Sequence, residues 1–116
     1  QYDAAKKHLL LALKHFEEFG WKPHTCICRV GLLVCAAAIN DEEDCMALFT
    51  LIDATIKDLE LVELDVAWCA HLAGRLLLKG KKQELAAKIL SLSLRQWQKM
   101  GREEEAKTVQ ILLDTF

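Results

Sequence analysis

Apolar residues recur along this chain at intervals of three and four positions, with polar residues between them. That spacing places apolar side chains on one face of an α-helix, whereas strict alternation would indicate a strand. A glycine, a proline or a short polar stretch interrupts the pattern repeatedly, and helices commonly begin or end at such positions. The pattern predicts six helices, over residues 3–19, 23–39, 41–59, 62–79, 82–99 and 102–115.

The residues between the predicted helices are typical of helix ends. Gly20, Gly80 and Gly101 follow apolar runs, so each is expected to adopt the left-handed conformation that closes a helix. Pro23 suits the first turn of the next helix, where a missing N–H leaves no hydrogen bond unmade. Asp41 offers a carboxylate that can accept a hydrogen bond from the first turn of the third helix.

The helical pattern is repeated within the chain. The stretch "HFEEFGW" (residues 15–21) aligns with "QWQKMGR" (residues 96–102) at an offset of 81 residues, which places Phe16 on Trp97. Both rings are expected to lie in the core. The first helix also matches residues 45–60 at an offset of 40. One helical pattern therefore recurs three times, which is the signature of a repeat architecture.

The stretches between these three helices also match each other. "CICRVGLLVCAAA" (residues 26–38) aligns with "CAHLAGRLLLKGK" (residues 69–81) at an offset of 43, which places Gly31 on Gly74. The repeated unit is therefore a pair of helices. A single amphipathic pair cannot bury its apolar faces alone, so the pairs are expected to stack.

The segment Asp58–Asp65 contains neither glycine nor proline. A turn and one continuous long helix are both compatible with its residues. The phase of the repeat favours a break near Glu60.

Length and composition fit one folded domain spanning residues 1–116. Apolar residues make up 53% and charged residues 28% of the chain, which is typical of a protein with a buried core. The formal net charge of −2 gives no strong field of one sign, so neither direct contact with nucleic acid nor binding to a membrane is expected. The longest uncharged stretch, Val30–Asn40, is far shorter than the ~20 apolar residues that span a bilayer.

The five cysteines are odd in number, and the sequence has no secretory signal pattern. Free thiols in the reducing cytoplasm are the expected state. The chain begins at Gln1 and stops within a helical pattern. We therefore expect a fragment of a longer protein, in contact with other domains of the same chain.

Candidate chemistry in the sequence is sparse. His24, Cys26 and Cys28 form an H-x-C-x-C pattern, but residues two apart on a helix point about 200° apart, so these donors should diverge. Only an unwound helix start could gather them around a metal, and packed thiols are the preferred interpretation. His8 and His15 are expected to be solvated or to lie beside a helix cap. The sequence carries no phosphate-binding loop and no nucleophile–base motif, so neither a cofactor nor catalysis is expected.

These features resemble the tetratricopeptide-repeat family, in a long-unit form like that of maltose-regulator-type transcription activators and signalling scaffolds. In that family a small residue in the first helix lets the second helix pack closely, as Gly31 and Gly74 would. Ala86 matches the family's early alanine in the second helix, and Trp97 and Phe16 match its large residue. The resemblance covers essentially the whole chain. It implies an all-α fold of stacked antiparallel helical hairpins that form a right-handed superhelix.

The resemblance also implies a concave groove lined by the first helix of each unit. The groove-facing positions of the first unit are Thr25, Cys28, Leu32, Cys35 and Ala36. Those of the second unit are Trp68, His71, Arg75, Leu78 and Lys79. Within both sets, the residues expected to bind a partner are Leu32, Trp68, His71, Arg75, Leu78 and Lys79. For Trp68, packing against a neighbouring unit is the alternative.

Two functional hypotheses follow from the resemblance. The first is a non-catalytic interaction module that binds a protein or peptide partner in the groove. The alternative is a segment of a multidomain transcription regulator that senses a ligand or a partner. The lack of converging polar groups counts against an enzyme.

Overall fold

The computed structural model describes residues 2–116, and this part of the chain forms helices without any β-strand. The all-α fold class predicted from the apolar pattern is confirmed, and every helix boundary lies within two residues of its predicted position. The helices are α1 (Tyr2–Phe19), α2 (Lys22–Ala38), α3 (Glu42–Leu59), α4 (Leu64–Lys79), α5 (Gln83–Lys99) and α6 (Glu103–Leu113).

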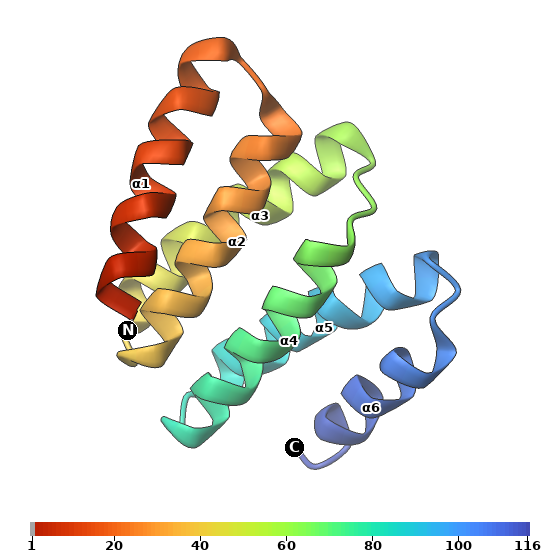
Figure 1. Cartoon of the computed structure of the whole chain (residues 1–116). Coiled ribbons are helices and arrows are strands. Elements are labelled where there is room, and N and C mark those ends of the chain that lie inside the picture. The colour runs from red at the N-terminus through yellow and green to blue at the C-terminus, as the bar shows by residue number, and fades with distance from the viewer. Residues whose placement is uncertain (1) are drawn as a thin grey trace.

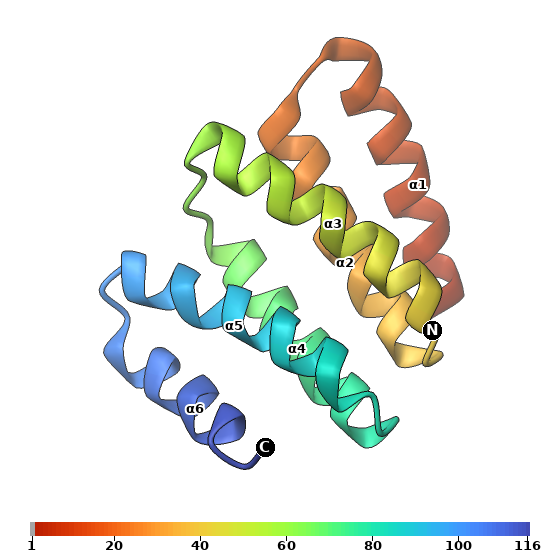
Figure 2. The same ribbon diagram turned by 180° about the vertical axis from the view of Figure 1, so that it is seen from behind.

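Consecutive helices run in opposite directions and form two layers. Figure 1 shows α2 and α4 side by side in the front layer, flanked by α1 and α6. Figure 2, the view from behind, shows the second layer, which is formed by α3 and α5. Helix α2 packs against α1, α3 and α4, and α5 packs mainly against α4 and α6. Although α3 and α4 follow each other in the chain, α3 packs mainly on α2, and α4 packs mainly on α5 and α2.

The apolar core lies between α2, α3, α4 and α5. Its fully buried members include Leu33 from α2, Ile52 from α3, Leu77 from α4 and Ile89 from α5. A second cluster around Trp97 connects α5 and α6 with one side of α4. Helix α1, by contrast, has no fully buried residue, so it is held on the molecule by one side only.

The two aligned glycines lie at close helix contacts, as their small size predicted. A Cβ atom on Gly74 would lie 2.5 Å from the Leu90 side chain of α5, and one on Gly31 would lie 3.0 Å from the Leu9 side chain of α1. Leu9 and Leu90 are themselves aligned by the offset of 81 residues. The partner of Gly31, however, is the preceding helix, whereas the partner of Gly74 is the following helix.

Two of the three glycines expected in the left-handed conformation adopt it, with φ of 69° at Gly20 and 71° at Gly101. The expectation for Gly80 is wrong, because its φ is −80° and Lys81 takes the left-handed position instead, with φ of 62°. A side chain on Gly80 would collide with that of Asn40. Close packing, rather than a special backbone angle, therefore explains this glycine.

The chain breaks at Glu60, as the repeat phase predicted. Glu60 is left-handed, with φ of 51°, and residues 61–63 form a short linker without regular structure, in which Glu63 is extended, before α4 begins. The Gln96 amide holds this linker: its nitrogen donates to the Leu61 carbonyl at 2.9 Å, and its oxygen accepts from the Glu63 amide at 2.9 Å. A buried glutamine on α5 thus satisfies backbone groups that a continuous helix would have paired internally.

Candidate functional site

Three of the residues expected to bind a partner lie together on α4. The side chain of Trp68 is 58% exposed, so Trp68 is not a core residue of this domain. His71 lies one turn along with its ring centroid 6.1 Å from that of Trp68, in an edge-to-face arrangement. Together with Leu72 and Arg75, they line a shallow hollow of about 40 Å³.

His71 is the polar residue at the bottom of this hollow. It is only 9% exposed, and its Nε2 atom is buried without a hydrogen-bond partner among residues 2–116. Burial, and next the positive charge of Arg75, lower the pKa of the His71 imidazole below its ordinary value of 6.5. The ring is therefore neutral at neutral pH.

An exposed apolar row continues the hollow along α4. Leu64, Trp68 and Leu72 are spaced four residues apart and all three are exposed, so they lie along one side of the helix. Arg75 and Lys79 extend the row with two exposed positive charges. Single exposed apolar side chains are common on folded domains, whereas contiguous ones form the kind of patch that interaction surfaces use.

The remaining expected residues do not belong to this row. Leu78 is half-buried and packs against both core clusters, so its role is structural. Leu32 is buried on α2 and lines a different hollow, between α1 and α3. The single groove expected from the sequence is therefore divided between two surfaces.

The second surface is a cleft with α2 as its floor and α1 and α3 as its walls. In Figure 2, α1 and α3 begin near each other at the N-terminal end of α1 and diverge toward the α1–α2 turn. The cleft has a volume of about 660 Å³ at the wide end and about 290 Å³ in a second hollow at the narrow end. The wide end is lined by Glu17, Gly20, Lys22, Thr25, Arg29, Ala54, Thr55 and Asp58.

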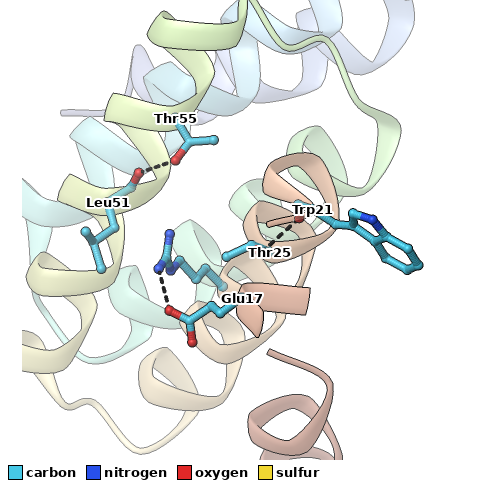
Figure 3. A network of polar contacts seen from close by, with 6 residues as sticks. Glu17, Trp21, Thr25, Leu51 and Thr55 are labelled. Carbon is cyan, nitrogen blue, oxygen red and sulfur yellow. Dashed lines mark hydrogen bonds and ion pairs between the residues drawn. The ribbon is translucent and has the colours of Figure 1, made fainter. Parts of the chain in front are cut away.

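Polar groups fix the floor and one wall of the wide end (Figure 3). The Thr25 hydroxyl donates to the Trp21 carbonyl at 2.9 Å, and the Thr55 hydroxyl donates to the Leu51 carbonyl at 3.0 Å. The Arg29 guanidinium, on a side chain that is 19% exposed, lies 3.4 Å from the Glu17 carboxylate. Because that distance is long for a charge-assisted hydrogen bond, most of the guanidinium's donor capacity remains free.

Aromatic rings cluster at the α1–α2 turn, and this cluster was not predicted from the sequence. Phe16, Phe19, Trp21, His15 and His24 form a chain of ring contacts with centroids 4.7 to 6.3 Å apart. Phe19 and Trp21 are largely exposed. The available signal was local density, because three of the eight Phe, Trp and Tyr residues fall within six positions.

The alignment of Phe16 with Trp97 predicted a core position for both rings. Trp97 is 1% exposed, which confirms the prediction for the second of them. Phe16 is only half-buried, because α1 is covered on one side and its aromatic neighbours are themselves at the surface. Equivalent sequence positions here have different neighbours.

The H-x-C-x-C residues diverge as helix geometry predicted. His24 is exposed in the aromatic cluster, whereas Cys26 is completely buried in the core and Cys28 is buried on another side of α2. Among residues 2–116, no group of His, Cys, Asp or Glu is arranged to hold a metal ion. Burial raises the pKa of the Cys26 thiol to about 11, so this thiol is protonated at neutral pH.

Comparisons with known proteins return no match to this chain, whether with models of protein families, with curated protein sequences or with solved structures. The assignment of a function therefore rests on the geometry of the chain's own residues. In the part of the chain that the structure describes, no helix combines the length and the apolar character needed to cross a bilayer.

Proposed function

We propose that this domain is a non-catalytic interaction module that binds a protein or peptide partner on the exposed row of α4. The single observation that carries the proposal is the exposed side chain of Trp68, between Leu64 and Leu72 and within one small hollow with Arg75. Tryptophan and arginine dominate the residues that contribute most to binding at protein interfaces. Burying this row against a partner would remove large apolar side chains from water.

The chemistry of the row indicates the kind of partner. Apolar residues four apart match the apolar face of an amphipathic helix, which also repeats every three to four residues. Arg75 and Lys79 form no ion pair within residues 2–116, so both charges are free to meet acidic groups. The partner that fits this row is an amphipathic segment with acidic residues at one end.

We further propose a tetratricopeptide-like stack as the architecture that presents this row. The recurrence of the helical pattern and the close helix contacts at the aligned Gly31 and Gly74 support it, although Gly31 contacts the preceding helix and Gly74 the following one. The right-handed superhelix, the cytoplasmic location and contact with further domains of the same chain belong to this proposal. We propose no catalytic activity for this chain, because its sequence contains no nucleophile–base motif.

A pair of tryptophan substitutions tests the α4 row. Peptides would be selected from a displayed random library on the purified chain, and their affinities measured by fluorescence polarisation. Trp68→Ala is expected to cost about 2 kcal/mol of binding, or roughly thirtyfold in affinity, with little change in melting temperature. Trp21→Ala is the matched control, since Trp21 is 48% exposed on another surface.

The control should leave affinity unchanged. Selected peptides that bind the Trp68→Ala variant as tightly as the parent chain would refute the assignment of the partner surface. A large loss of melting temperature in Trp68→Ala would show instead that Trp68 stabilises the fold.

The second candidate function is the ligand-sensing segment of a transcription regulator. The observation in its favour is the cleft over α2, because about 660 Å³ falls within the range of ~300–1,000 Å³ typical of small-molecule sites. Screening of a metabolite panel by thermal shift would test it. A ligand of the cleft should raise the melting temperature of the parent chain in proportion to the logarithm of its concentration.

A further inference from the structure

The wide end of the cleft between α1 and α3 combines two positive and two negative side chains. Lys22 and Arg29 come from α2, Glu17 comes from α1, and Asp58 comes from α3. Their formal charges cancel, so the cleft does not attract a ligand of one sign. Such a surface is complementary to a ligand that itself carries separated charges of both signs.

Lys22 and Asp58 are both available to a ligand. They line the same cleft, yet within residues 2–116 neither forms an ion pair with the other or with a third residue. The Arg29–Glu17 pair, at 3.4 Å, is the one internal ion pair of the lining. A guanidinium has five N–H donors, and this pair uses only a small part of them.

The two threonines add acceptors for a positively charged group. Each hydroxyl hydrogen is donated to a backbone carbonyl, Thr25 to that of Trp21 and Thr55 to that of Leu51. Because a hydroxyl has two lone pairs besides its hydrogen, both oxygens can still accept hydrogen bonds. Both threonines line the cleft (Figure 3), where an ammonium group could donate to them.

We infer that this cleft binds a zwitterionic small molecule, namely an amino acid or a short peptide with both termini free. The carboxylate pairs with Arg29 and Lys22, and the ammonium group pairs with Asp58 and Glu17. The hollow at the narrow end lies between the same helices and is lined by Leu10, Leu13, Leu32 and Leu48 among others, so it can accept an apolar side chain. The inference does not depend on the proposed role of the α4 row.

The test uses the tripeptide Ala-Leu-Ala in three forms: with free termini, N-acetylated and C-amidated. Binding to the chain would be measured by titration calorimetry, and the site located by ¹H–¹⁵N chemical-shift mapping. The free form should bind about tenfold more tightly than either blocked form, because each block removes one charged group. The largest shifts are expected in the amides of residues 17–29 and 54–58.

Single substitutions then assign the charges. Asp58→Asn should weaken binding of the free tripeptide without altering that of the N-acetylated form, which lacks the ammonium group. Lys22→Gln should weaken the free tripeptide without altering the C-amidated form. Asp65→Asn is the matched control for Asp58→Asn, because it removes one exposed carboxylate from α4 and should change nothing.

Three results would overturn the inference. They are equal affinity for the free and blocked tripeptides, shifts that map to α4 or α6 instead of the cleft, and no binding of the free form at about 10 mM. Each of them leaves the α4 row unaffected, since that proposal depends on the separate loss of affinity in Trp68→Ala. Failure of Trp68→Ala to weaken library peptides would equally leave the cleft unaffected.

Discussion

At the scale of single residues, His71 shows how a side chain can be predicted on the correct helix and still have a different environment. The spacing of Trp68, His71 and Arg75 placed all three on one side of α4, and the structure brings them into one hollow. The sequence could not show that His71 would be buried beside the exposed Trp68 with an unpartnered Nε2. That difference depends on how neighbouring helices cover one edge of α4, which is tertiary information.

The lowered pKa of His71 gives a prediction for stability against pH. The unfolded chain has an imidazole pKa near 6.5, and the folded chain has a lower one, so the unfolded state binds more protons below pH 6.5. The contribution of His71 is therefore fully present above this pH and declines as pH falls toward the folded pKa. Urea unfolding at pH 7.5, 6.5 and 5.5 measures it.

Substitution separates His71 from the other titrating groups. His71→Gln should flatten the fall in unfolding free energy between pH 7.5 and 5.5, whereas His24→Gln, at an exposed ring, should leave it unchanged. Parallel curves for the parent chain and His71→Gln would contradict the predicted role of burial. Arg75→Gln should give an intermediate slope, because the guanidinium is the second cause of the lowered pKa.

At the scale of helices, the sequence predicted the elements well and their neighbours less well. Helix ends depend on local signals such as the left-handed Gly20 and the Asp41 side chain, which accepts from the Asp44 amide at 3.1 Å. The position of the groove, by contrast, depends on which helices pack over α2, and no local signal in the sequence shows this. Gly31 contacts the preceding helix, α1, rather than the following helix, α3. The neighbouring Leu32 lines the cleft between α1 and α3, which is separate from the α4 row. Internal repeats fix equivalent positions but not equivalent surroundings.

The two aligned glycines provide a prediction about these contacts. Alanine raises helix propensity by up to about 1 kcal/mol at either position, so this gain is common to both variants. At Gly74 the new Cβ would lie 2.5 Å from Leu90, which is completely buried and has no room to move. Gly74→Ala is therefore expected to lose about 1–3 kcal/mol of unfolding free energy.

Gly31→Ala is the matched comparison. Its Cβ would lie 3.0 Å from Leu9, a half-buried side chain on the loosely held α1 that can shift. Chemical denaturation should show little loss, or a small gain, for this variant. Equal destabilisation of the two variants would mean that α1 is held as rigidly on α2 as α5 is on α4.

At the scale of the whole molecule, burial is distributed unevenly over the helices. Helices α2, α4 and α5 contribute most of the buried residues, α6 contributes two, and α1 contributes none. Stability in such a structure is local, because an element can open alone when few buried contacts hold it. The molecule should therefore consist of a strongly held centre with a weakly held helix at its N-terminal edge.

Native-state hydrogen exchange tests this distribution. Amides in the middle of α1 should exchange through local opening, with a free energy well below that of global unfolding and little dependence on denaturant. Amides in α4 and α5 should exchange only when the whole domain unfolds.

The aligned leucines extend the test: Leu9→Ala should lower protection in α1 alone, whereas Leu90→Ala, in the buried cluster with Trp97, should lower it throughout the domain. If α1 amides follow the global unfolding reaction, α1 is an integral part of the cooperative core. The wall that it forms for the cleft would then be fixed before any ligand binds.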